Sequence, residues 1–264
     1  MSENQILQDT IIQILSDYYA TVNRQPANIS YQFTSDMEAS YKKLRPDLSD
    51  DIHDDQNNYN GLMLTPKDMA QPFTILINAN KIKEYEEIAP FTWIGTLVHE
   101  TTHVLDYIEY AKLIDAKDYD SLLRKEHHLM FQLWTEFNAR SKGYYFVRKY
   151  SSGSQLQDES QIDGIINQEL PSNERYLFKC YHSTNDGTMQ MYYVAQFLGR
   201  IQVLQDLFPD FFDDEWVSEM PLFTYNSWMH DWYVFLHTHT ELEDAFKHFD
   251  EMKEILSQNF TWLE

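Results

Sequence analysis

Residues 92–109 read TWIGTLVHETTHVLDYIE. Apolar residues recur in this stretch every three or four positions, which is the spacing of one face of an α-helix. At about 100° per residue, they gather on the side opposite His99. The side chains expected in this buried stripe are Ile94, Leu97, Val98, Thr101, Val104, Leu105 and Ile108. The pattern therefore predicts a helix over residues 90–111 with one buried face.

The other face of this helix carries His99 and His103. Histidines at positions i and i+4 lie one turn apart on one side of a helix, so both imidazoles can reach one metal ion. Zinc favours imidazole nitrogen in a tetrahedral shell, and we therefore expect Zn²⁺ as the cofactor. Gly95, one turn earlier, leaves the approach uncrowded, and we expect this face to be open. The alternative is an amphipathic helix whose polar face happens to hold two histidines.

Glu136, in the segment LWTEFNARSKGYYF, is the candidate third metal ligand. It follows His103 by 33 residues, and its helical face includes the small residues Ala139 and Gly143, which would let another helix approach closely. A carboxylate in apolar surroundings needs a partner, because burying it unpaired costs several kcal/mol. Zinc would supply that partner. The alternative is a surface salt bridge from Glu136 to Arg140, four residues later.

Four other residues near these candidates are weaker ligand candidates. Glu109 would lie on the lateral or buried side of the first helix, and is therefore a poor ligand. His127 and His128 are two or more turns from Glu136 and are expected at the surface or at a helix end. Asp106, one turn beyond His103, is either an acceptor that orients an imidazole or a surface aspartate.

The rest of the sequence predicts an α+β fold that is mostly helical, with a small sheet. Further helices are expected at residues 4–21, 36–44, 119–150, 187–206 and 240–258, the last opening on a capping-box pattern at 240–243. Short strands are expected at 61–64 and 73–78. Polar loops are expected at 47–60 and at 151–175, the second being either a long surface loop or a weak boundary. We expect a region 1–150 and a C-terminal helical region 151–264 that packs on the same domain.

Charge and composition exclude several classes of protein. The net charge is −22, from 42 acidic and 20 basic residues, so binding to nucleic acid or to an anionic membrane is not expected. Cys180 is the one cysteine, so no intrachain disulfide can form. The N-terminus does not resemble a signal peptide, and no apolar run is long enough to span a membrane. A cytoplasmic location is therefore expected, and no obligate partner is evident.

The segment VHETTHVLDY resembles the active-site helix of the zincin metallopeptidases. A strand at 73–78, this helix and a second helix offering a glutamate resemble the gluzincin pattern, over roughly residues 60–150. The resemblance implies a zincin-like core in which His99, His103 and Glu136 bind zinc. It implies that Glu100 acts as general base on a zinc-bound water and that a peptide or protein is the substrate. It also implies that strand 73–78 lies along the cleft and pairs with the substrate backbone.

The resemblance leaves two questions open. Zincins often add a residue that stabilises the oxyanion, and this sequence does not distinguish among the candidates. They are Tyr144, Tyr145, Tyr181, His182, His230, His237 and His239. The alternative functions are a non-catalytic zinc-binding module, regulatory or interacting, on the same scaffold, and a purely structural helical protein.

Overall fold

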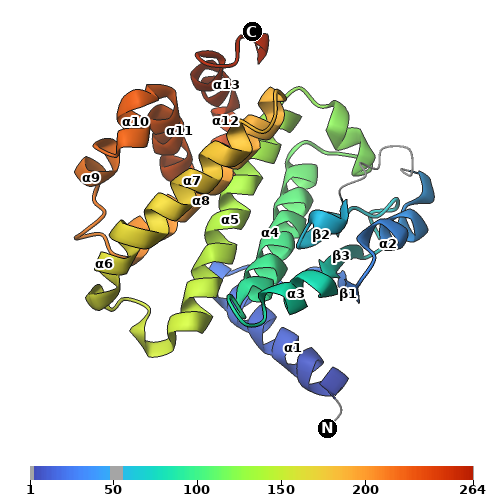
Figure 1. Ribbon diagram of the computed structural model, residues 1–264. Coiled ribbons are helices and arrows are strands. Elements are labelled where there is room, and N and C mark those ends of the chain that lie inside the picture. The colour runs from blue at the N-terminus through green and yellow to red at the C-terminus, as the bar shows by residue number, and fades with distance from the viewer. Residues whose placement is uncertain (1–2, 48–55, 264) are drawn as a thin grey trace. The chain divides into compact units, whose positions relative to one another are not determined.

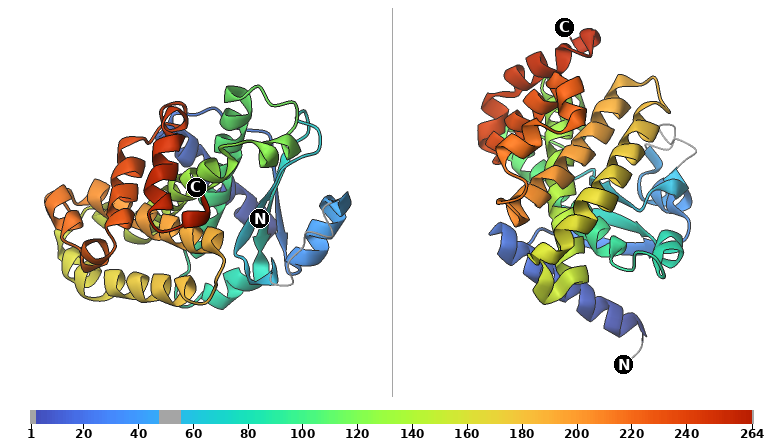
Figure 2. Two further views of the ribbon diagram at one scale, coloured as in Figure 1. Left: turned by 90° about the horizontal axis from the view of Figure 1, so that it is seen from above. Right: turned by 60° about the vertical axis from the view of Figure 1, so that its left-hand side comes forward.

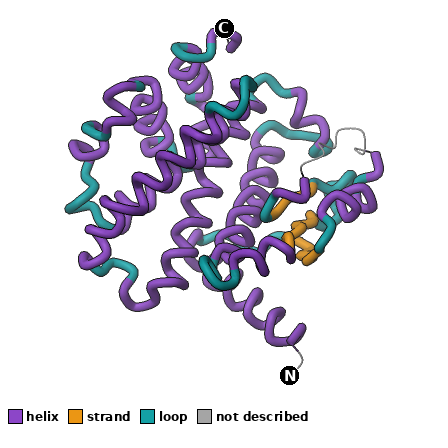
Figure 3. Tube along the Cα trace, in the orientation of Figure 1, coloured by secondary structure: helices purple, strands orange, loops and turns teal. Residues whose placement is uncertain are grey.

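The computed structural model describes residues 3–47 and 56–263. They form a mostly helical α+β fold with one three-stranded sheet, as expected from the sequence (Figure 3). The chain divides into two compact units, Met1–Leu105 and Asp106–Glu264, and the division falls within one long helix. The expected division into regions 1–150 and 151–264 stays a prediction. Among the described residues, no helix has both the length and the apolar character that crossing a membrane requires.

The first unit contains the sheet and the start of the long helix (Figure 1). Its elements are α1 (Glu3–Val22), β1 (Ile29–Thr34), α2 (Met37–Leu44), a 3₁₀ turn (Gln56–Asn58), β2 (Gly61–Leu64), β3 (Phe73–Asn78), α3 (Ala79–Tyr85) and the first turns of α4 (Thr92–Leu113). The helices expected at 4–21, 36–44 and 90–111 and both expected strands are confirmed. The sequence did not predict β1 or α3. Of the polar loop expected at 47–60, residues 48–55 lie outside the described residues.

The sheet has the strand order β1-β3-β2, with β1 parallel and β2 antiparallel to β3. Ile75, Leu76 and Ile77 of the central strand are fully buried. Because both edges of β3 are paired within the sheet, the expectation that strand 73–78 pairs with a substrate backbone is wrong. An edge strand lies on each side of it, and in β2 Gly61 lies opposite Ile77.

The second unit is helical throughout its described residues. After the last turns of α4 come a 3₁₀ helix (Asp120–Arg124), α5 (His128–Ser152), two 3₁₀ turns (Gly153–Gln155, Glu159–Gln161), α6 (Ile162–Gly164), a π-helical turn (Ile165–Glu169), α7 (Leu170–Tyr181), α8 (Gly187–Leu207), α9 (Asp214–Ser218), α10 (Pro221–Tyr225), α11 (Ser227–Thr238), α12 (Leu242–Lys247), α13 (Phe249–Ser257) and a last 3₁₀ turn (Thr261–Leu263). Of the expected helices, 187–206 is confirmed.

Three expectations for this unit are wrong. The helix expected from residue 119 begins at His128. Residues 151–175 are largely helical rather than a loop, because apolar side chains spaced through a polar sequence are buried there: Ile162, Ile165 and Leu170. The helix expected at 240–258 is divided at His248 into α12 and α13, and its N-cap residue, Glu241, makes no side-chain capping hydrogen bond.

Helices α5 and α8 cross in close contact, and α7 lies beside α8 (Figures 1 and 2). Gly199 of α8 permits the approach. A Cβ atom at this position would lie 2.7 Å from the backbone oxygen of Phe137 and 3.1 Å from the backbone nitrogen of Ser141. Both obstacles are backbone atoms of α5, so they cannot rotate away, and the two helices would have to separate.

We predict that Gly199→Ala destabilises the protein by about 1–3 kcal/mol, the usual cost of adding a methyl group to a packed interface. Equilibrium unfolding in urea measures it. The matched control is Gly164→Ala in α6, where an added Cβ would meet no atom within 4 Å. This control should be neutral or stabilising by up to about 1 kcal/mol. Equal stability of the two variants would contradict the close α5–α8 contact.

Candidate metal centre

The buried face of α4 is the face that its sequence predicts. Six of the seven expected side chains are at most 7% exposed, and only Ile108 is partly exposed: Ile94, Leu97, Val98, Thr101, Val104 and Leu105. This burial fixes which side of the helix faces the core. It therefore also fixes where the histidine face points.

Hydrogen bonds through two threonine side chains hold the buried side of α4 in the first unit. The hydroxyls of Thr101 and Thr102 each donate to the carbonyl oxygen one turn earlier, at 2.7 and 2.8 Å. Each also accepts a hydrogen bond from a tyrosine, Thr101 from Tyr31 at 3.2 Å and Thr102 from Tyr18 at 2.8 Å. Since these threonines are the two residues between Glu100 and His103, the tyrosines restrict rotation of α4 at the site itself.

His99 and His103 bring their ring nitrogens together. Their Nε2 atoms are 3.0 Å apart, and the rings are nearly perpendicular, with centroids 4.6 Å apart. A tetrahedral zinc ion with Zn–N bonds of about 2.05 Å would hold two nitrogens about 3.3 Å apart. The two imidazoles therefore need to move apart by only a few tenths of an ångström to share one ion. The expectation that they lie on one face of the helix is confirmed, and a shared metal ion stays a prediction.

The sequence suggested that the histidine face is open, but in the structure this face is largely buried. His99 is 7% exposed and Glu100 is 9% exposed, while His103 is partly exposed. The helical spacing of the sequence places polar residues on this face but does not show which other segments cover it. Burial removes competing water from the imidazoles and the carboxylate, which strengthens their electrostatic interactions with a bound cation.

The edge strand β2 begins directly against Glu100. A Cβ atom on Gly61 would lie 2.5 Å from Cγ2 of Thr96, 3.0 Å from Cγ of Glu100 and 3.2 Å from its Oε1. Only glycine fits this position without displacing one of those side chains. One signal of this contact is present in the sequence: a glycine that opens a strand often marks the close approach of another group.

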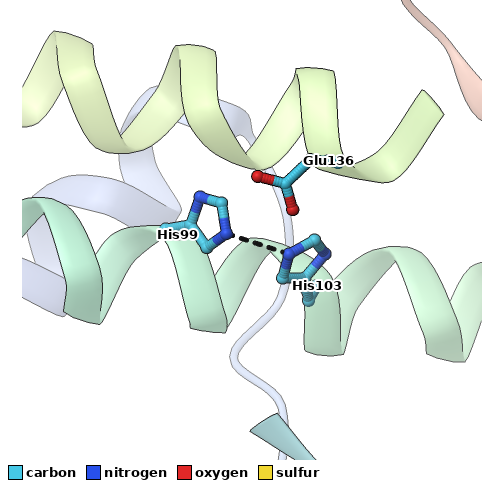
Figure 4. A group of neighbouring side chains, drawn as sticks. All are labelled: His99, His103 and Glu136. Atoms are coloured by element: carbon cyan, nitrogen blue, oxygen red, sulfur yellow. Dashed lines mark hydrogen bonds between the residues drawn. The ribbon is translucent and has the colours of Figure 1, made fainter. Parts of the chain in front are cut away.

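Glu136 on α5 is fully buried. One ligand atom from each of His99, His103 and Glu136 lies within 4.8 Å of the other two (Figure 4). The ion pair with Arg140, the alternative for this carboxylate, is present with Nη2 of Arg140 3.9 Å from Oε1, but the expected surface location of Glu136 is wrong. The three side chains thus offer two imidazoles and one carboxylate, a donor set that suits zinc.

Asp106 is fully buried, so the alternative of a surface aspartate is wrong. Its Oδ2 accepts hydrogen bonds from Oγ1 of Thr135 at 2.7 Å and from Nδ2 of Asn138 at 2.9 Å. These donors lie on either side of Glu136 in α5. Asp106 therefore holds α5 in register with the last turns of α4. Its expected role as an acceptor for an imidazole stays a prediction.

The competing histidines of α5 are not part of this group. His127 occupies the N-cap position of α5 without a side-chain capping bond, as a residue at a helix end. His128, expected at the surface or at a helix end, begins the helix but is only 7% exposed. Neither ring nitrogen of His128 has a hydrogen-bond partner among the described residues, and burial lowers the pKa of this imidazole to about 4.

A second group of possible ligands lies at the end of α11: His239, Asp244 and His248. Nδ1 of His239 is 2.6 Å from Oδ2 of Asp244, and the two imidazoles stack with centroids 4.5 Å apart. This hydrogen bond lowers the pKa of Asp244, which is an exposed carboxylate. An ordinary histidine–aspartate pair accounts for this contact.

No family model, curated protein or solved structure matches the chain.

We predict that His128 makes the protein less stable in acid. Between pH 6.5 and 4 the imidazole takes up a proton in the unfolded chain but not in the folded one, so the free energy of unfolding falls as the pH falls through this window. His128→Phe should flatten the pH dependence there, as measured by urea unfolding at a series of pH values. His127→Gln is the neighbouring control and should leave the slope in place. An unchanged slope in His128→Phe would contradict the assigned burial.

Proposed function

We propose that this protein is a zinc-dependent metallopeptidase of the gluzincin type. In this proposal His99, His103 and Glu136 bind the metal and Glu100 is the general base. The observation that carries it is the 3.0 Å separation of the two Nε2 atoms on one helix, with a buried carboxylate in the same group of ligand atoms. Glu100 is adjacent in sequence to the first ligand.

Two imidazoles and one carboxylate form the ligand set of many catalytic zinc sites, which keep a fourth position for water or substrate. Zinc bound there would lower the pKa of a coordinated water towards about 7 and polarise the carbonyl of the scissile bond. The hydrogen bonds of Asp106 to Thr135 and Asn138 support Glu136 as the third ligand. Asp106 follows His103 by one turn of α4, and its two partners flank Glu136 in sequence.

The carboxylate of Glu100 is the group that moves protons in this proposal. It takes a proton from the attacking water and later delivers it to the leaving amine. Gly61 and Thr96 limit where this carboxylate can lie, because a glycine at position 61 leaves just enough space for the Glu100 side chain. The low exposure of Glu100 keeps bulk water from competing for that proton.

Strand β2 is the element best placed to bind an extended peptide. It is an edge strand, and it begins at Gly61 against Glu100. Addition of a peptide strand to a sheet edge is a common mode of backbone recognition. A hollow of about 250 Å³ in the first unit is bordered by Asn60 and Thr96, next to this point, and by Trp93.

A second candidate function is a non-catalytic zinc-binding module, regulatory or interacting, on the same scaffold. The burial of His99 and Glu100 favours it, because a closed site stabilises a metal without admitting a substrate. The two functions share the ligands and differ in the role of Glu100. Hydrolysis therefore has to be measured separately from metal binding.

We predict that the purified chain binds about one zinc ion and hydrolyses peptides, and that Glu100→Gln keeps the zinc while its rate falls by about 10²-fold or more. His99→Ala and His103→Ala should lose both properties. Metal analysis after dialysis measures the zinc, and a broad library of peptides with mass-spectrometric detection measures cleavage. His239→Ala is the control for the second group of ligands and should change neither.

The outcomes separate the two functions. Zinc that depends on His99 and His103, without hydrolysis of any peptide, would support the non-catalytic module and overturn the peptidase. Zinc that is lost in His239→Ala and kept in His99→Ala would overturn both.

We predict that Gly61→Ala lowers kcat/KM by about 10- to 100-fold, since small displacements of catalytic groups cost that much. The added methyl group would displace Thr96 or Glu100 but none of the proposed ligands. Zinc content should therefore stay unchanged. Steady-state kinetics on any cleaved peptide, beside Gly164→Ala as the control, tests this. Unchanged kinetics would show that the start of β2 does not position Glu100.

A further inference from the structure

A separate hollow in the second unit lies along α7 and α8. It encloses about 240 Å³, its solvent-open part included. Arg200, Asn173 and Gln196 contribute polar groups to its lining, and Tyr176 and Phe197 contribute aromatic ones. The hollow combines an apolar wall with one cationic group, the usual composition of a site for a small organic ligand.

The polar groups left over at this hollow are hydrogen-bond donors. Nη1 of Arg200 donates to Oδ1 of Asn173, which uses the acceptor of that amide. The Nδ2 atom of Asn173 is buried and has no partner among the described residues, and the same holds for Nε of Arg140 on the adjacent helix α5. Buried donors without acceptors are costly. A ligand that relieves this cost must bring acceptor oxygens.

The charges at the hollow are also unbalanced. Among the described residues, no carboxylate lies within 4.0 Å of the Arg200 guanidinium, although the chain as a whole carries a net charge of −22. The Glu169 carboxylate interacts electrostatically with Arg200, but its hydrogen bond, at 2.9 Å, is to Arg148. Burial and then the Arg140 cation lower the pKa of Arg200 to about 10, so it remains charged at neutral pH. A partly buried cation of this kind attracts an anion.

We infer that this hollow binds a carboxylate group, and that the carboxylate is the free C-terminus of a peptide. The planar fork of an arginine matches the two oxygens of a carboxylate. The unpaired Asn173 amide adds a second donor. Tyr176 and Phe197 offer apolar contact to the side chain of a terminal residue, which inorganic phosphate lacks.

The position of the hollow links it to the proposed site. Arg140 follows Glu136 by one turn of α5, a rise of about 6 Å. Arg200 follows Gly199, whose added Cβ would lie 3.0 Å from Cβ of Arg140. Arg200 therefore lies near the part of α5 that carries Glu136. The role of this peptide as a substrate rests on the proposed function, while its binding does not.

Isothermal titration calorimetry tests the binding directly, with the full chain treated with EDTA so that no metal competes for the carboxylate. The probes are N-acetyl-phenylalanine, its C-terminal amide and inorganic phosphate. N-acetyl-phenylalanine should bind saturably, and its amide about tenfold or more weakly, because the amide lacks the charge. Arg200→Gln should weaken the binding of N-acetyl-phenylalanine by a similar factor. Arg175→Gln, an exposed arginine of α7, is the matched control and should stay within about twofold.

Each outcome decides the proposal. Tighter binding of phosphate than of N-acetyl-phenylalanine would assign the hollow to a free inorganic anion and overturn the peptide C-terminus. Equal binding of acid and amide, or no saturable binding of any probe, would overturn the carboxylate site. Because metal-free protein is used, these results do not depend on zinc or on hydrolysis. If hydrolysis is found, Arg200→Gln should raise KM for free peptides and leave KM for their amides unchanged.

Discussion

The rotation of α4 about its own axis is the constraint on which the candidate site depends. An apolar stripe buries one side of the helix, and Tyr18 and Tyr31 hold the hydroxyls of Thr102 and Thr101 on it. With that side fixed, His99 and the histidine one turn later must point the same way. A rotation by one residue, about 100°, would turn both imidazoles together away from the carboxylate of Glu136.

The fold could be predicted where its signal is local. The periodicity of α4 and α8 and the apolar run of β3 are each contained in a short stretch of sequence, and all three are confirmed. Strand β1 was missed because its partner lies more than forty residues away and its own burial is only intermediate. The region 151–175 was misread because polar residues outnumber the few apolar ones that make it helical.

The candidate site, too, could be predicted where its residues are neighbours in sequence and not where folding brings them together. The histidine pair and Glu100 are neighbours in sequence, so their placement follows from helix geometry alone. Glu136 could be chosen only by the order of elements and by its apolar surroundings. The contact of Gly61 with Glu100 left only a weak signal in the sequence and the donors around Arg200 left none, because both arise from segments brought together by folding. Long-range contacts of this kind leave almost no trace in a single sequence.

The most direct test of the central claim is anomalous diffraction from crystals grown with zinc, with data collected above and below the zinc absorption edge. The account predicts one strong peak within bonding distance of Nε2 of His99, Nε2 of His103 and the carboxylate of Glu136. A peak at His239 and Asp244 alone, or a peak at the histidine pair with the Glu136 carboxylate turned away from the ion, would contradict it.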